Sequence, residues 1–124
     1  MSLPIPASVR IAPMRRSDRS GIERLYARSV RANPDGFIQD LAFHGPIFDL
    51  LSGFAASGGA AEVLKPVSGG PVIGMGGLRP TAPGTAELCK LHLDAAFHGR
   101  GLGRQLAERL LARAQRLGRR RVDL

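Results

Sequence analysis

The 124-residue sequence predicts a single α/β (α+β) domain, spanning residues 1–124, that combines three helices with strands, two of which form an antiparallel hairpin. Three observations lead to this prediction. Apolar residues recur at helical spacing in three separate segments. A short Gly-Pro connection joins two strand-like segments into a hairpin. A run of alternate glycines then links a further strand to the last helix.

The first expected elements are a short strand and an amphipathic helix. The strand is Val9 to Ala12. Ser17 or Asp18 then caps the helix, because either side chain can accept hydrogen bonds from the first N–H groups. One face of the helix carries Ile22, Leu25, Tyr26, Ser29 and Val30. The turn sequence from Asn33 to Gly36 ends it.

The segment from Phe37 to Phe54 is apolar and is interrupted at Gly45-Pro46. Pro46 suits the first turn of a helix, and helical spacing after it predicts a second helix. The apolar positions of that helix are Ile47, Leu50, Leu51 and Phe54. The segment also holds Phe37, Phe43, Phe48 and Phe54, which we interpret as core residues. The alternative is that some of these phenylalanines line a substrate pocket.

Three strands are expected next. Ala61 to Val67 and Val72 to Leu78 are joined by the turn from Ser68 to Pro71, and so short a connection makes them an antiparallel hairpin. After a loop from Pro80 to Gly84, the segment AELCKLHLD, residues 86–94, supplies the third strand.

The leucines of the third strand do not alternate evenly. Leu88 and Leu91 are an odd number of residues apart, but Leu91 and Leu93 an even number, so a regular strand would place them on opposite faces. One extra residue at Cys89-Lys90, a β-bulge, would return them to one face and leave backbone N–H and C=O groups for another partner. A strand buried on both faces is the alternative.

Glycines at positions 99, 101 and 103 precede the last expected helix. Glycine permits turns that other residues avoid and lets the backbone approach a ligand closely. The helix has apolar residues at Leu102, Leu106, Leu110, Ala114 and Leu117, and it ends at Gly118. Its free N–H groups and positive dipole end, together with Arg100 and Arg104, favour an anion. A flexible turn before a good helix start is the alternative.

Composition narrows the classes of partner. The formal net charge of +8 favours a polyanion, which is a phosphorylated cofactor, a nucleic acid or an acidic membrane surface. The single cysteine, Cys89, excludes an internal disulfide, and no metal site is expected because His44, His92 and His98 lie at no helical ligand spacing. Since no secretion signal or membrane-spanning apolar run is present, we expect a cytoplasmic protein without a membrane partner.

The continuous run from Glu87 to Gly118 resembles the acetyl-CoA-binding core of the GNAT superfamily of N-acetyltransferases. The signature of that superfamily is [RQ]-x-x-G-x-[GA] between a bulged strand and a helix, and here it corresponds to the run from His98 to Gly103. His98 departs from the usual Arg or Gln and offers less attraction to phosphate. The preceding elements agree in order, and the resemblance covers roughly residues 9–124. It implies the acyl-CoA N-acyltransferase fold, with a mixed, mostly antiparallel central sheet flanked by helices.

The resemblance also implies a function. Acetyl-CoA would be the acyl donor, and a small-molecule or peptide primary amine would attack it directly in a ternary complex. The backbone of the bulged strand at Leu91, His92 and Leu93 would bind the pantetheine arm. The pyrophosphate would lie against His98, Gly99, Arg100, Gly101, Leu102, Gly103 and Arg104. A dinucleotide-binding fingerprint fits less well, because Arg104 stands where its third glycine would be.

Two further residues of the third strand have expected roles. Glu87 matches an acidic position that acts through water as the general base in some members of the superfamily. Otherwise it is a solvated strand end or binds the substrate amine. Cys89 is expected to be a small strand residue, because direct transfer needs no nucleophile and no His-Asp partner is evident.

The segment from Arg119 to Leu124 begins a strand beside the bulged one. In the superfamily a further helix and two strands follow, so the domain is expected to lack its last helix and strands, and the exposed edge favours a homodimer. One alternative is a catalytically impaired CoA-binding fragment. Another is a basic nucleic-acid-binding module. Its arginines would be Arg109, Arg113, Arg116 and those from Arg119 to Arg121, but they spread around the helix without aromatic stacking residues.

Overall fold

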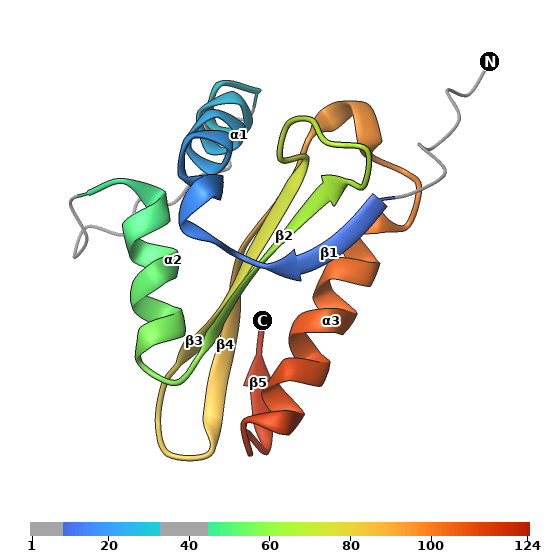
Figure 1. Cartoon of the computed structure of the whole chain (residues 1–124). Helices are drawn as coiled ribbons and strands as arrows, with labels where there is room; N and C mark the ends of the chain where they lie inside the picture. The colour runs from blue at the N-terminus through green and yellow to red at the C-terminus, as the bar shows by residue number, and fades with distance from the viewer. Residues whose placement is uncertain (1–8, 33–44) are drawn as a thin grey trace.

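The computed structural model describes residues 9–32 and 45–124 (Figure 1). Its elements are β1 (Val9–Pro13), the 3₁₀ turn η1 (Arg16–Asp18), α1 (Arg19–Ala32), α2 (Ile47–Ala56), β2 (Ala60–Pro66), β3 (Gly74–Pro80), β4 (Thr85–Leu93), the 3₁₀ turn η3 (Ala95–Phe97), α3 (Leu102–Arg116) and β5 (Arg121–Asp123). These are the helices and strands that the sequence predicts, with ends shifted by a few residues. The expected turn at 33–36, Phe37, Phe43 and His44 lie outside the described residues.

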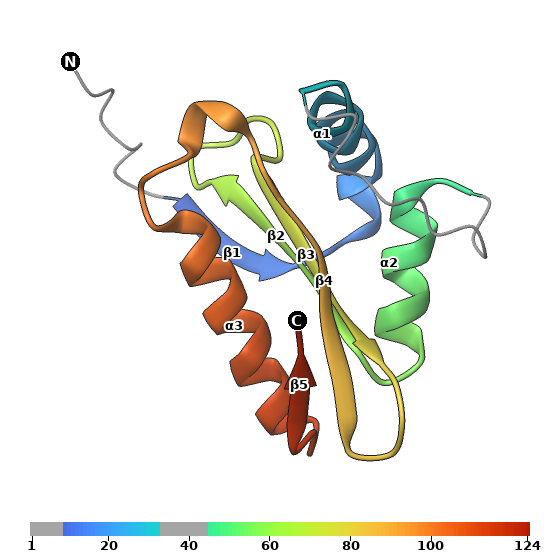
Figure 2. The ribbon, with the colours of Figure 1, turned by 180° about the vertical axis from the view of Figure 1, so that it is seen from behind.

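The strands form one sheet in the order β1-β2-β3-β4-β5. The first three pairings are antiparallel, and β5 runs parallel to β4. Helices α1 and α2 cover one face of this sheet and α3 covers the other, as the two opposite views show (Figure 1, Figure 2). The expected mixed, mostly antiparallel sheet with flanking helices is therefore confirmed.

The core follows from the alternation of apolar side chains along the strands. On the α1 and α2 face, Val63 and Met75 pack with Leu51, and the expected core residues Phe48 and Phe54 are buried there too. On the α3 face, Leu88 packs with the leucines that recur along α3. Each helix thus turns its apolar stripe to the sheet, as its spacing predicts.

The start of α1 differs from the expected cap. The 3₁₀ turn η1 leads directly into α1, so that Asp18 lies inside the helical run. Its Oδ2 accepts a hydrogen bond from the backbone N–H of Arg15 at 2.8 Å, and its Oδ1 pairs with Lys65. Asp18 therefore links the start of the helical run to β2, and its backbone hydrogen bond is to a residue that precedes it in the chain.

Strand β4 contains the expected bulge, displaced by one residue. Met75 faces His92 and Gly77 faces Cys89, so that Gly76 alone faces Lys90 and Leu91. Lys90 has φ +57°, a left-handed conformation that is uncommon for a residue with a side chain. The extra residue returns the three leucines of β4 to the α3 face, which confirms the prediction. Leu88 packs with Leu106, Leu91 approaches Leu110 beside Gly76, and Leu93 packs with Leu102.

Candidate active site

The loop between β4 and α3 is anchored at its first residue, Asp94. Its backbone N–H donates to the carbonyl of Ile73 at 2.8 Å, which continues the sheet by one residue. Its carboxylate accepts from the N–H of Ala96 at 3.1 Å and pairs with Arg28 of α1 at 3.2 Å. The loop therefore begins from a fixed point shared by the sheet and α1.

The glycines of the loop give it a shape that other residues would resist. Gly99 has φ +78° and Gly101 has φ +76°, both in the left-handed region. A Cβ placed on either one would meet no described atom within 4 Å. The left-handed backbone explains why glycine is favoured at both positions, and the space above them is open to a ligand.

The open space faces the start of α3. Gly101 is its N-cap and offers no side chain to cap the helix. Since the first N–H groups of a helix have no intrahelical partner, those of Leu102, Gly103 and Arg104 are available to an anion. The first bond within the helix is the one from the N–H of Gln105 to the carbonyl of Gly101, at 3.1 Å.

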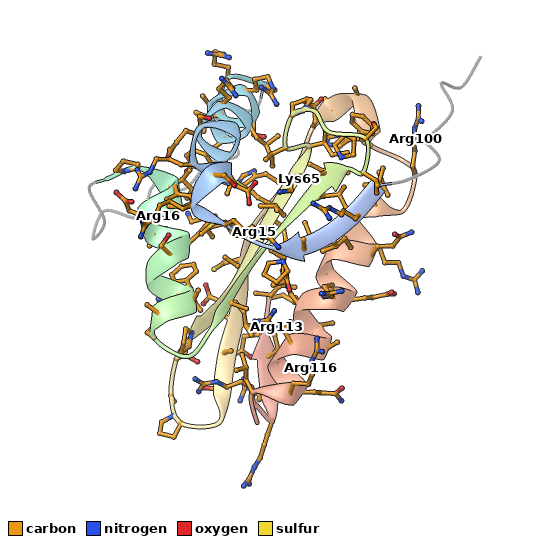
Figure 3. The ribbon with its side chains drawn as sticks, viewed as in Figure 1. Arg15, Arg16, Lys65, Arg100, Arg113 and Arg116 are labelled. Atoms are coloured by element: carbon orange, nitrogen blue, oxygen red, sulfur yellow. The ribbon has the colours of Figure 1, made fainter. Side chains whose placement is uncertain are left out.

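The charges around the helix start are mostly positive. The first turn of α3 carries no acidic residue. Arg104 makes an exposed i,i+4 ion pair with Glu108 at 3.0 Å, which is weak because both side chains are solvated. Arg100 extends from the loop at one end of the molecule (Figure 3). The helix dipole and two arginines therefore act in the same direction.

His98 bonds back to the strand. Its Nε2 lies 2.8 Å from the carbonyl oxygen of Leu93, the last residue of β4. The ring therefore closes the loop onto the end of the strand.

The edge of β4 that faces away from β3 is partly uncovered: among residues 9–32 and 45–124, no strand pairs with it along residues 88–93. β5 pairs only with Thr85, Ala86 and Glu87, so the edge from Leu88 to Leu93 is not covered by it. The bulge lies within this stretch, and the side chain of Leu91 is 39% exposed. This edge leads directly into the glycine loop, so an extended ligand bound along β4 would reach the start of α3.

The face of β4 that points toward α1, opposite the face covered by α3, carries polar side chains. The ring of His92 meets that of Tyr26 edge to face, with centroids 5.2 Å apart. Burial, with a smaller effect from the charge of Lys90, lowers the pKa of His92 to about 4. The imidazole is therefore neutral at physiological pH. Burial and the nearby carboxylate of Glu23 raise the pKa of Tyr26.

Cys89 lies on the same face and packs against the core. Burial, and then the charge of Glu87, raise the pKa of its thiol to about 11. The reactive thiolate is thus scarce at neutral pH, which supports its interpretation as a strand residue.

Glu87 lies apart from the other expected site residues. Its carboxylate pairs with Arg79 of β3 at 2.9 Å, and its backbone pairs with Asp123 of β5. The residues from Leu91 to Arg104 lie together at the opposite end of β4. The structure therefore brings together the expected donor-binding residues and places Glu87 at the far end of the same strand.

Sequence reasoning missed two residues that support the site, because both act through residues distant in sequence. Arg28 fixes Asp94, and Glu23 accepts from the N–H of Phe48 in the first turn of α2 at 3.2 Å. Their position among exposed residues of α1 gave no signal for these roles. Tyr26 was assigned to the apolar face of α1, and that face carries it to His92.

Two other features are absent from the described part of the chain, which excludes residues 1–8 and 33–44. Three or more His, Cys, Asp or Glu side chains gather nowhere in it closely enough to hold a metal ion. None of its helices has the length and apolar character needed to cross a membrane.

Comparison with known proteins gives one consistent result. Residues 49–124 match the model of the Acetyltransferase (GNAT) family. A GNAT-family acetyltransferase from Staphylococcus aureus is 15% identical, with a TM-score of 0.74 over 90% of this chain and 70% of that one. No curated protein sequence matches.

Two further solved structures have the same fold. A GCN5-related N-acetyltransferase from Kribbella flavida is 20% identical, with a TM-score of 0.74 over 95% of this chain and 71% of that one. A GNAT-family acetyltransferase from Brucella melitensis, solved with acetyl-CoA, is 19% identical, with a TM-score of 0.70 over 91% and 72%. At these identities the likeness establishes the acyl-CoA N-acyltransferase fold.

Proposed function

This chain belongs to the acetyltransferase (GNAT) family, and we propose that it transfers an acetyl group from acetyl-CoA to a primary amine by direct attack in a ternary complex. The family is one of acyl-CoA-dependent N-acyltransferases. The observation that carries the proposal is the arrangement of β4, the glycine loop and α3, which lies within the matched residues 49–124.

The residues present fit the donor. The open space above Gly99 and Gly101 suits a pyrophosphate, which would accept hydrogen bonds from the N–H groups that begin α3. The uncovered edge of β4 from Leu91 to Leu93 suits the extended pantetheine arm, which would add to the sheet like a strand. The Brucella structure with acetyl-CoA supports this assignment, because it has the same fold.

When bound, the donor would supply a thioester carbonyl carbon that a free amine can attack. The C–N bond forms as the C–S bond breaks, and CoA leaves as a thiolate that takes up a proton from solvent. The bulge at Lys90 and Leu91 takes backbone groups of β4 out of regular pairing, and a strand N–H there would polarise the carbonyl oxygen. Holding donor and acceptor together removes most of the entropic cost of the encounter. Cys89 takes no part, because its thiol stays protonated.

The incoming ammonium must lose a proton before it can attack. We assign this step to Glu87, acting through water, with the Arg79 guanidinium holding its carboxylate in place. His92 is the alternative because it lies next to the bulge, although burial makes its imidazole a weaker base than usual. The acceptor is a small-molecule or peptide amine that enters from the α1 and α2 side of β4.

A transfer assay tests this function. The chain is incubated with acetyl-CoA and a panel of primary amines, and both the released CoA thiol and the acetylated amine are measured. Glu87→Gln should lower kcat by about 100-fold or more, a typical loss for a general base. Asp49→Asn is the matched control, because Asp49 is an exposed carboxylate of α2 that also pairs with an arginine.

Each outcome of the assay is informative. If His92→Gln lowers kcat and Glu87→Gln behaves like Asp49→Asn, His92 is the proton acceptor. If acetyl-CoA binds but neither CoA nor acetylated amine is formed with any acceptor, the chain is the catalytically impaired CoA-binding form and the transferase proposal is wrong.

A further inference from the structure

A cavity of about 270 Å³ lies away from the donor site, between α1, β1, β2 and the connection from β2 to β3. Its polar lining includes Arg10, Ser17, Asp18, Ser20, Arg24 and Lys65. Lys65 appears beside α1 in Figure 3, whereas Arg100 marks the loop before α3 at another end of the molecule. None of the expected donor-binding residues lines this cavity.

Two cationic residues of the cavity lining lie side by side on neighbouring strands. Arg10 of β1 and Lys65 of β2 are directly opposite in the antiparallel register. Their strand neighbours Val9, Ile11 and Leu64 belong to the core on the α3 face, so both cationic side chains are on the α1 face. Like charges directly opposite one another destabilise a strand pair. A compensating negative charge is therefore expected nearby.

The protein supplies only part of that charge. Asp18, which is 4% exposed and fixed by the N–H of Arg15, pairs with Lys65 at 2.9 Å. Lys65 is thereby held in one position and its charge is matched. Within residues 9–32 and 45–124, the side chains of Arg10 and Arg24 make no ion pair or hydrogen bond. The cavity thus contains three cations and one carboxylate, an excess of two positive charges.

We propose that this cavity binds a small organic phosphate. Two guanidinium groups suit a phosphate dianion, because their planar donors match its oxygens in paired hydrogen bonds. The hydroxyl groups of Ser17 and Ser20 at the rim provide further donors. The volume is close to the lower limit for small-molecule sites, so it accommodates a phosphate with a short organic body but not a coenzyme.

The test is a calorimetric titration of the full chain with glycerol 3-phosphate and with inorganic phosphate, at constant ionic strength and with acetyl-CoA present at saturation. Saturable binding at one site is expected for at least one of them. Arg10→Gln and Arg24→Gln should each weaken it by about tenfold, since each removes a charge-assisted contact. Arg116→Gln is the control, because Arg116 is an exposed arginine on α3, outside the cavity.

Two results would overturn the proposal. One is the absence of saturable binding of both phosphates, and the other is an equal loss in all three variants, which would indicate only general attraction to a basic protein. A second readout does not depend on the ligand. Because Arg10 faces Lys65, Arg10→Gln should leave the thermal midpoint of the free chain unchanged or higher, so lost binding would not reflect misfolding. Acetyl-CoA binding by these variants should be unchanged, which separates this proposal from the proposed function.

Discussion

At the scale of single residues, the bulge in β4 decides which chemistry each side chain can perform. It turns His92 toward Tyr26, so that the imidazole is neutral, and it leaves Cys89 packed in the core with a protonated thiol. Because no His-Asp partner is evident in the sequence, Cys89 was not expected to be a nucleophile. The sequence could not predict the environment of His92, because that depends on α1, which is more than sixty residues earlier in the chain.

The first residue-scale prediction concerns Cys89. Cys89→Ala should change kcat of the transfer reaction by no more than about twofold, because direct transfer forms no bond to the protein. Steady-state kinetics with a fixed amine would measure it. A loss of activity in a variant with an unchanged unfolding curve, together with an acetylated wild-type chain in mass spectra, would contradict direct transfer.

The second residue-scale prediction concerns the pH dependence of stability. The pKa of His92 is about 4 in the folded chain and 6.5 in the reference state, so the unfolded chain binds the extra proton more readily. The contribution of His92 is fully present above pH 6.5 and is lost as the pH falls through 4. The free energy of unfolding, measured by urea titration at several pH values, should fall less for His92→Gln than for wild type between pH 6.5 and pH 4. Parallel curves for variant and wild type would show that His92 does not titrate in this way.

At the scale of elements, the unit formed by β4, the glycine loop and α3 was the most predictable part of the chain. The odd spacing of Leu88 and Leu91 located the bulge to within one residue, because a register change is encoded locally. The positions of Gly99 and Gly101 identified the loop for the same reason. The ion pairs between α3 and the sheet were not predictable, since Glu62 of β2 meets Arg109 and Arg113 only in the folded chain.

The prediction for the elements concerns the pH dependence of stability that arises from Glu62. This residue is fully buried, and its Oε1 lies 3.1 Å from Arg113 and 3.5 Å from Arg109, but its Oε2 has no hydrogen-bond partner among the described residues. Burial therefore outweighs the two arginines and raises its pKa above the usual value of 4.5. The carboxyl stabilises the fold most below that value, and this contribution is lost as the pH rises through the folded pKa.

Glu62→Gln removes this titration while keeping the shape of the side chain. Its thermal midpoint relative to wild type should therefore increase from pH 4 to pH 7. Differential scanning calorimetry at several pH values would measure the difference. A variant that becomes relatively less stable as the pH rises would show that the arginines stabilise the charged form.

At the scale of the whole molecule, the order of helices and strands along the chain followed from hydrophobic spacing and turn chemistry, and the resemblance implied a sheet with flanking helices. The cavity lined by Arg10 and Lys65 was not predictable, because it is formed by residues of β1, η1, α1, β2 and the β2–β3 connection. The net charge was also uninformative by itself. Figure 3 shows Arg15 and Arg16 before α1, Arg100 in the loop and Arg113 on α3, so these labelled cations lie on separate elements of the fold.

The proposed function requires the start of α3 to bind the phosphates of acetyl-CoA, and calorimetric titration of the chain with acetyl-CoA measures that binding. Gly101→Asp places a carboxylate where the phosphates are expected. Gly84→Asp is its control, because Gly84 has φ +77°, also has open space around its Cβ position, and lies in the β3–β4 turn. We predict saturable one-site binding that Gly101→Asp abolishes and Gly84→Asp preserves. Equal binding by both folded variants, or none by the folded wild-type chain, would contradict the proposed function.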